Sequence, residues 1–388
     1  MKPIYLDYNA TTPIDSEVAE AMRPYLFELF GNPSSSHWYG KQTQQAVAQA
    51  RQRVADLLHC RPSEIVFTSG GSESNNYAIK GVAFKNHTRG GHIITSEIEH
   101  PAVIEVCRYL ETKNFEVTYL PVDSEGLIDP GNVARAIRPQ TILISVMHAN
   151  NEVGTLQPIA DIARLARQHG IAVHTDAAQS VGKIPTDVEA LGVDLLTIAG
   201  HKLYAPKGIG VLYIRQGTQL EKLIHGANHE RDLRAGTENV LEIVGLGKAC
   251  AVAQRDLSVN MAHMQQMRDR LQTGLQQRLP NLRVNGHPTQ RLPNTLSVSF
   301  AHLLANDLLA AMPGVAASSG SACHADTVEV SSVLAAMQVP LQEAMGTIRF
   351  SVGKMTTAEE IDQAIDMVVQ AVQQLRQAGP GVLHGTSV

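Results

Sequence analysis

Between about residues 15 and 215, short apolar runs rich in β-branched residues alternate with helical patterns. The runs cover residues 65–68, 92–95, 115–119, 142–147 and 171–174. Amphipathic helices are expected between them, for example over residues 46–58 and 159–169. This alternation predicts an α/β fold in which helices cover both faces of a mostly parallel sheet. Such sheets bind ligands at the carboxyl ends of their strands, so polar residues that directly follow the runs are the candidates for a functional site.

The chain after residue 215 no longer shows this alternation of short apolar runs and helical patterns. A long helix is expected over residues 240–278, and its methionine stripe, Met261, Met264 and Met267, is interpreted as core packing rather than a cofactor site. A strand-like run at 295–300 and further helices are typical of a smaller α+β domain. Because 388 residues exceed what one small core needs, we expect two domains. The large domain is predicted over residues 15–255, and the small domain over residues 1–14 and 256–388.

Charge and hydropathy exclude several classes of protein. The formal net charge is −5 and there is no long basic run, which argues against a nucleic-acid binder or a protein of anionic membrane surfaces. No apolar stretch approaches the ~18–20 residues that span a bilayer. The first residues lack the apolar core and cleavage site of a signal peptide, so the expected location is the cytoplasm.

The chain has four cysteines, and none lies two residues from another, so no metal clip or redox pair of the Cys-x-x-Cys type is expected. Cys107 and Cys250 fall in apolar helical patterns and are predicted to be core thiols. Cys60 ends a helix-like segment and is expected to be inert. Cys323 differs, because it lies in a small, polar segment over residues 315–326, where a thiol can be accessible and partly ionised.

An acidic residue and a lysine follow two apolar runs. Asp176 comes just after the run at 171–174, and Lys202 follows the run at 193–199. Pyridoxal phosphate needs this combination, since a carboxylate keeps its pyridine nitrogen protonated and a lysine forms a Schiff base with its aldehyde. The sequence therefore predicts a pyridoxal-phosphate enzyme.

A segment of small residues at 68–76 follows the first run and opens a helix. Gly71 and Ser72 there allow backbone N–H groups to approach a phosphate at a helix N-terminus. The lysine of a nucleotide-binding P-loop is missing. An ordinary Gly/Ser helix cap is the alternative, and the presence of Asp176 and Lys202 favours the phosphate site.

Two further polar groups follow runs of the same predicted sheet. His100 follows the run at 92–95, where an imidazole can stack on a cofactor ring and move protons near neutral pH. Asn150 and Asn151 follow the run at 142–147, and their amides can bind the cofactor's ring oxygen or a substrate carboxylate. A lone histidine more often has a structural role. The predictions for His100, Asn150 and Asn151 therefore gain support only when they are taken together.

Together these segments resemble the cysteine desulfurases of the class V aminotransferase family, in the iron–sulfur and nitrogen-fixation branch. The resemblance runs from residues 4–13 to residues 348–353. Its most specific motifs are Thr68 to Asn76, Glu99-His100, Asn150-Asn151-Glu152, Asp176-Ala177-Ala178-Gln179, His201-Lys202, Arg234-Ala235-Gly236-Thr237 and Ser319-Gly320-Ser321-Ala322-Cys323. It implies a fold-type I pyridoxal-phosphate transferase that acts on L-cysteine as a homodimer.

The resemblance also implies a role for each matching residue. Lys202 holds the cofactor, Asp176 pairs with its pyridine nitrogen, and Gln179 contacts its phenolic oxygen. His100 stacks on the ring and relays protons. The phosphate ligands are Gly71, Ser72, His201 and, from the second subunit, Thr237. The substrate carboxylate is fixed by Arg349, whose planar fork suits a carboxylate, and by Asn151, which also contacts the cofactor.

Cys323 decides the reaction that the resemblance implies. In the family, the thiolate at this position attacks the sulfur of the bound cysteine, alanine leaves, and a persulfide remains on the enzyme. The sulfur then supplies iron–sulfur cluster or thio-cofactor synthesis through an acceptor protein. The spacing from Cys323 to Ser331 resembles the branch whose longer catalytic loop, on the small domain, delivers sulfur directly to partner proteins.

Two departures from the family pattern stand out. Ala227-Asn228 replaces glycines in a loop at the dimer-formed edge of the site, and Ala199 stands where many relatives carry a phosphate-binding serine. The segments around Lys202 and Cys323 also resemble selenocysteine lyases, which makes release of selenium from L-selenocysteine the alternative function. A non-catalytic sulfur carrier or scaffold is a third hypothesis, and retention of Lys202, Asp176, Arg349 and Cys323 argues against it. An aminotransferase is less attractive because of Cys323.

Overall fold

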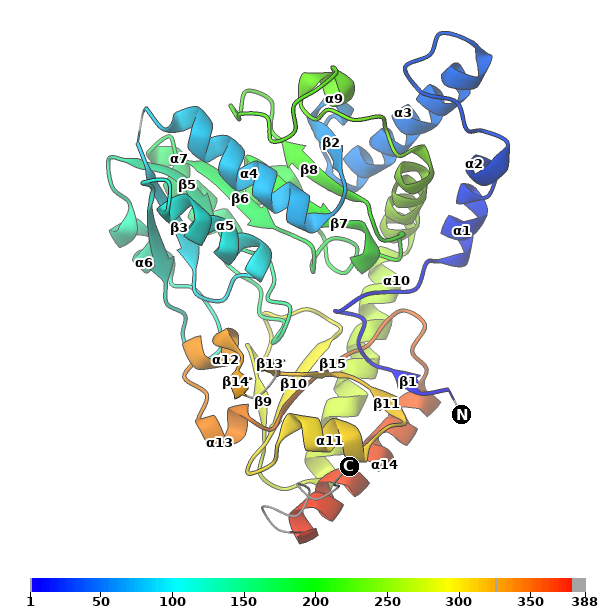
Figure 1. The fold of residues 1–388 in the computed structure, drawn as a ribbon. Coiled ribbons are helices and arrows are strands. Elements are labelled where there is room, and N and C mark those ends of the chain that lie inside the picture. The colour runs from blue at the N-terminus through cyan, green and yellow to red at the C-terminus, as the bar shows by residue number, and fades with distance from the viewer. Residues whose placement is uncertain (1, 89, 325–326, 379–388) are drawn as a thin grey trace.

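The computed structural model describes residues 2–88, 90–324 and 327–378, with all their side chains except those of residues 321–324, 327–329 and 378. The described chain forms a large sheet flanked by helices and a smaller sheet beside it (Figure 1). A single long helix, α10 (Val240–Arg278), runs from one to the other.

The large sheet has seven strands within the described residues, in the order β2-β8-β7-β6-β5-β3-β4. They are β2 (Ile65–Thr68), β3 (His92–Ser96), β4 (Glu116–Leu120), β5 (Thr141–Ser145), β6 (Ala172–Asp176), β7 (Leu195–Ala199) and β8 (Gly210–Ile214). The strands from β4 to β7 pair in parallel, whereas β8 is antiparallel to both of its neighbours. The predicted mostly parallel sheet is confirmed, and every predicted run forms a strand with small differences at its ends.

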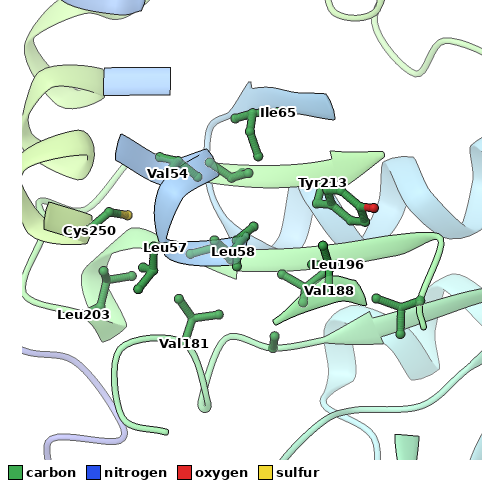
Figure 2. Packing of buried hydrophobic residues seen from close by; sticks show 14 of the residues in the cluster. Val54, Leu57, Leu58, Ile65, Val181, Val188, Leu196, Leu203, Tyr213 and Cys250 are labelled. Carbon is green, nitrogen blue, oxygen red and sulfur yellow. The ribbon is translucent and has the colours of Figure 1, made fainter. Parts of the chain in front are cut away.

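Helices cover both faces of this sheet, as predicted. Side chains alternate between the faces of a strand. Accordingly, Ile93 packs in a cluster with α4 (Gly71–Asn86) and α5 (Pro101–Glu111). The next residue, Ile94, packs on the other side with α3 (Trp38–Leu58) and α7 (Ile159–Gln168). Figure 2 shows this second side, where Leu58 of α3 lies over the strand that carries Leu196.

The smaller sheet is antiparallel, in the order β12-β15-β10-β9. Its strands are β9 (Leu282–Asn285), β10 (Thr295–Phe300), β12 (Ser318–Ser319) and β15 (Thr347–Ser351). Its core includes side chains of α11 (Ala305–Ala311), α14 (Ala358–Ala378) and the second part of α10. The first strand of the chain, β1 (Ile4–Tyr5), pairs with β11 (Val315–Ala316), so the N-terminal segment joins this core.

Helix α10 has the bounds that the sequence predicted. Its first part carries Cys250 into the core of the large sheet, and its second part carries Met264 and Met267 into the core of the small sheet. Met264 and Met267 are therefore core residues, as predicted, whereas Met261 is only partly buried and belongs to neither core cluster. The predicted domain division after residue 255 lies between these two parts and stays a prediction.

The other elements connect the two sheets or flank them. They are α1 (Ser16–Met22), α2 (Pro24–Phe27), η1 (Pro62–Glu64), α6 (Pro130–Ala136), α8 (Val188–Leu191), η2 (Gly200–Lys202), α9 (His229–Asp232), β13 (Ser321–His324), β14 (Thr327–Val330), α12 (Ser332–Ala336) and α13 (Leu341–Ala344). No helix in the described part of the chain has the length and apolar character needed to cross a membrane.

Candidate active site

A pocket of about 350 Å³ opens at the carboxyl edge of the large sheet. Asp176 is the last residue of β6, and Lys202 ends the short helix η2 that follows the neighbouring strand β7. The predicted site residues that line the pocket are Gly71, Ser72, His100, Asn151, Asp176, Gln179, His201, Lys202 and Arg349. Side chains predicted from separate segments therefore meet in one place, where a parallel sheet is expected to bind its ligand.

The carboxylate of Asp176 is buried and oriented by two donors. The Asn75 side-chain amide donates to its Oδ2 at 2.7 Å, and the Ala178 N–H donates to its Oδ1 at 2.9 Å. Each carboxylate oxygen accepts more than one hydrogen bond, so Asp176 keeps acceptor capacity toward the pocket. Asn75, which sequence reasoning missed, is itself almost fully buried, and its Oδ1 has no hydrogen-bond partner among the described residues.

The ammonium group of Lys202 is held by the N-terminal segment. Its Nζ donates to the carbonyl oxygens of Asn9 at 2.5 Å and Ala10 at 2.7 Å. Burial, followed by the charge of Arg349, lowers the pKa of Lys202 to about 8, against the opposing effects of Asp7 and Asp176. A lysine with a lowered pKa is partly a neutral amine near neutral pH, and the neutral amine is the nucleophilic form.

The N-terminus of α4 faces the pocket through Gly71 and Ser72. No described side chain caps this helix, so its first N–H groups remain available to an anion. Gly70 has a φ of 151°, a conformation that favours glycine. A Cβ added at Gly71 would lie 3.2 Å from the Cβ of Ala199, which also lines the pocket. The backbone therefore approaches the pocket closely here.

Burial lowers the pKa of two histidines of the pocket. The Ala102 N–H donates to His100 Nδ1 at 3.1 Å, so the ring proton of neutral His100 lies on Nε2. Although part of His100 faces solvent, burial of its ring is the main reason that its pKa lies below the ordinary value. His201 Nδ1 lies 3.1 Å from the hydroxyl oxygen of Thr11, and burial lowers the pKa of His201 to about 4.

Arg349, on β15 of the small sheet, reaches the pocket from the opposite side. One terminal nitrogen donates to Asp7 Oδ1 at 2.8 Å and to the Ser318 hydroxyl at 2.9 Å, and the other donates to the Asn151 carbonyl at 3.2 Å. Its Nε is buried and has no partner among the described residues. A guanidinium held in this way is a fixed cation at the pocket wall, which suits a carboxylate ligand.

Three of the four cysteines have fully described surroundings. Cys107 and Cys250 are buried, and burial raises the pKa of each thiol to about 12, as expected for core cysteines. The Cys60 pKa is also raised to about 12, mainly by burial, which agrees with an inert thiol. The backbone of Cys323 lies in β13, paired with Val328 of β14, and its side chain lies outside what the structure describes.

Thr237, the predicted phosphate ligand of the second subunit, does not line the pocket of its own chain. It lies between α9 and α10, beside a separate depression bordered by Gly236 and Glu238. The loop with the Ala227-Asn228 departure precedes α9 and borders another groove, of about 520 Å³.

Asn9 is a site residue that sequence reasoning missed, although it lies in the segment that carries the resemblance. It is 1% exposed, and its side-chain amide donates to the Asn151 carbonyl at 3.1 Å and to Thr295 Oγ1 at 2.8 Å. Its Oδ1 accepts from Lys183 at 3.1 Å and from Asn294 at 2.9 Å. These partners lie on both sides of the pocket, and a sequence pattern contains no signal for them.

Comparison with known proteins gives consistent results. The family described as aminotransferase class-V matches residues 4–364. Proteins named cysteine desulfurase IscS from Dictyoglomus turgidum and Methanosarcina thermophila are each 48% identical over 381 residues, which is 98% of this chain and 97% and 94% of theirs. Among solved structures, a NifS-like protein aligns with a TM-score of 0.91 at 39% identity, covering 96% of this chain and 100% of that one. The apo structure of a cysteine desulfurase from Thermococcus onnurineus aligns with a TM-score of 0.85 at 25% identity. The alignment covers 96% of this chain and 95% of that one.

Proposed function

This chain belongs to the class V aminotransferase family, and from that membership we infer that it is a pyridoxal-phosphate-dependent cysteine desulfurase. It converts L-cysteine to L-alanine and supplies the sulfur for iron–sulfur cluster assembly. The observation that carries this function is the meeting of Asp176 and Lys202 in one pocket with Arg349 facing them. The relatives' names favour L-cysteine over the alternative substrate L-selenocysteine.

The residues of the pocket fit pyridoxal phosphate. Asp176 offers a buried carboxylate to a protonated pyridine nitrogen, and Lys202 offers an amine to the aldehyde. The uncapped N–H groups of α4 at Gly71 and Ser72 suit the phosphate, with His201 beside them. Gln179 and His100 are assigned to the phenolic oxygen and the ring face. When bound, the cofactor supplies an aldehyde that captures the substrate amine and a ring that accepts electrons from the reacting carbons.

The chain's own groups bind the substrate and move protons. Arg349 and Asn151, which both line the pocket, hold the carboxylate of L-cysteine. With the cofactor bound, Lys202 would take up a proton from the substrate carbons and return it to them, helped by its lowered pKa. His100 carries its proton on Nε2 and relays it at the ring face.

Cys323 takes the sulfur. Its thiolate attacks the substrate sulfur, an S–S bond forms, and the C–S bond breaks with its electron pair left on the β-carbon. That carbon takes up a proton and becomes the methyl group of alanine, while a persulfide remains on Cys323. The position of this residue supports the assignment, since its strand β13 follows β12, whose Ser318 pairs with Arg349 in the small sheet.

The second copy of the chain is proposed to complete the site. Thr237 does not line the pocket of its own chain, and an apolar surface lies near the segment that leads to it. This surface contains Phe27, Phe30, Trp38 and Tyr39, which are 81%, 70%, 60% and 47% exposed. A groove between Pro33 and residues 227–231 joins it to the Thr237 segment. Exposed aromatic residues in such a cluster are typical of an interface, and a homodimer brings Thr237 to the partner's pocket.

The test measures alanine and sulfide together after incubation of the purified protein with pyridoxal phosphate, L-cysteine and a thiol reductant. Equal amounts of alanine and sulfide are expected from the wild type, and none from Cys323→Ala, which still binds the cofactor and turns yellow. Cys60→Ala, which removes an inert thiol, is the matched control and keeps full activity. Pyruvate with sulfide, or full activity of Cys323→Ala, would contradict the assignment. Release of selenium from L-selenocysteine by Cys323→Ala would favour the alternative function.

A further inference from the structure

Lys183 is a buried lysine that lies beneath the pocket. It is 5% exposed, and no carboxylate among the described side chains forms an ion pair with it. Its Nζ donates instead to two amide oxygens, Gln179 Oε1 at 2.7 Å and Asn9 Oδ1 at 3.1 Å. A buried amino group without a counter-ion is costly, so its retention next to a site calls for a role.

The hydrogen bond from Lys183 to Gln179 fixes the orientation of the Gln179 amide. A primary amide presents an acceptor at one end and two N–H donors at the other, and rotation by half a turn exchanges them. Lysine offers N–H donors to whatever oxygen it contacts, whether it is an ammonium or a neutral amine with two N–H bonds. Gln179 Oε1 is therefore held toward Lys183, and the Nε2 group points into the network, donating to the Asn9 carbonyl at 3.0 Å.

The same arrangement orients a second amide. Asn9 Oδ1 accepts from both Lys183 and Asn294, which turns its Nδ2 toward the Asn151 carbonyl at 3.1 Å. The Asn9 carbonyl in turn accepts from Lys202 at 2.5 Å. Lys183 thus lies at the base of a network that reaches the cofactor lysine on one side and Asn151 on the other.

We propose that Lys183 is a positioning residue that fixes the polarity of Gln179, so that Gln179 presents only N–H donors to the phenolic oxygen of pyridoxal phosphate. The inference rests on the proposed function, in which Gln179 contacts that oxygen. A donor at this place stabilises the ionised oxygen relative to its protonated form. Loss of the fixed polarity weakens that stabilisation, because the amide is then able to turn its own oxygen toward the cofactor.

The charged groups that border the small cavity beside Lys183 are Lys202, Lys354 and Asp15. Lys202 and Arg349 oppose the protonation of Lys183, and burial is the larger reason that its pKa lies well below the ordinary value. Lys354 is a lysine in a different environment that borders the same small cavity. Lys354 pairs with Asp15 at 2.5 Å and packs on the Tyr204 ring, without contact to Gln179. Lys354→Met is therefore the matched control for Lys183→Met.

The test follows the visible absorption of the yellow holoenzyme as a function of pH. Lys183→Met is expected to raise the pH midpoint of the spectral change by about one unit, because a hydrogen bond to a charged acceptor is weakened. The affinity for pyridoxal phosphate, measured by equilibrium titration of the apoprotein, is expected to fall by about tenfold. Lys354→Met is expected to lower thermal stability and leave the midpoint unchanged. An unchanged midpoint in Lys183→Met would overturn the proposal.

A double-variant cycle separates positioning from a direct effect of charge. Gln179→Leu removes the amide, so adding Lys183→Met to it should not move the midpoint further. Additive shifts would mean that Lys183 acts on the cofactor directly, and would also overturn the proposal. Lys183→Gln, which keeps an N–H donor beside Gln179, serves if Lys183→Met does not fold, and is expected to shift the midpoint less and in the same direction. A wild type that never becomes yellow with pyridoxal phosphate would instead contradict the proposed function.

Discussion

At the scale of single residues, the pKa of Lys202 is set by neighbours with opposite effects. Burial and the Arg349 charge lower its pKa to about 8, whereas Asp7 and Asp176 raise it. Because the folded pKa lies below the ordinary value of 10.5, the nucleophilic neutral amine becomes the major form above about pH 8 rather than above 10. Arg349 is at once the proposed substrate ligand and one cause of this shift.

The rate at which the apoprotein becomes yellow with pyridoxal phosphate is therefore expected to rise with pH through a midpoint of about 8. Arg349→Leu removes a neighbouring positive charge and should raise the midpoint by roughly half a pH unit or more. Stopped-flow absorbance over a pH series measures the midpoint of the wild type and that of Arg349→Leu. Arg270→Leu, which breaks an exposed pair with Asp362, is the control and should leave the midpoint in place. A midpoint that Arg349→Leu lowers would contradict the electrostatic argument.

Sequence reasoning found the residues that carry reactive groups and missed those that orient them. Asp176 and Lys202 follow apolar runs, so periodicity alone located them at the edge of the sheet. Lys183 and Asn9 lie 174 positions apart and have no such pattern, because their hydrogen bond arises only when the N-terminal segment folds back over the pocket. Asn75 was within a predicted motif, yet its contact with Asp176 depends on how α4 crosses β6.

At the scale of elements, long periodic segments were predictable and short ones were not. Strand β10 and helix α10 have the predicted bounds, because each buries a regular set of apolar side chains. The two-residue strands β1 and β12 are too short to carry a period, and they exist because β11 and β15 offer edges to pair with. Helix α9 was also not predictable, since its backbone is set by a contact with a distant residue.

Helix α9 shows how one ion pair holds an unfavourable backbone. Glu230, Arg231 and Asp232 have consecutive positive φ angles of 48°, 58° and 68°, which cost energy in residues other than glycine. The buried carboxylate of Glu230 accepts two hydrogen bonds from Arg51, both at 2.6 Å, and one from the Phe67 N–H at 3.0 Å. This contact ties the segment that leads to Thr237 to strand β2 and helix α3.

Glu230→Ala is expected to lower the free energy of unfolding by about 3 kcal/mol, because it leaves the Arg51 charge buried without its partner. Urea denaturation measures the loss. Glu20→Ala removes an equally short pair, but one whose side chains are 65% and 70% exposed, so it should cause no measurable change. Equal effects of the two substitutions would mean that the α9 backbone does not depend on the ion pair.

At the scale of the whole molecule, the pocket lies between parts of the chain that the sequence separates widely. The large sheet contributes Asp176 and Lys202, the small sheet contributes Arg349, and the N-terminal segment between them contributes Asn9. One predicted ligand, Thr237, lies outside this arrangement, and a groove lined by Pro33 and Glu238 lies between its segment and the exposed residues Phe27, Phe30, Trp38 and Tyr39. A site that lacks one ligand beside an unpartnered apolar surface is the pattern expected of a protomer whose pocket is completed by a second copy.

Mixed dimers test this arrangement directly. Lys202→Ala inactivates the pocket of its own chain, and Thr237→Val inactivates the pocket of its partner if Thr237 acts across the interface. Co-expression with two affinity tags isolates dimers that contain one chain of each kind, in which one of the two pockets has both residues intact. Such dimers should regain about half of the wild-type activity, measured as alanine formed from L-cysteine, whereas each variant alone is nearly inactive. If Thr237 served its own chain, both pockets of the mixed dimer would be damaged and activity would stay absent, and a protein that sediments as a monomer would exclude the shared site altogether.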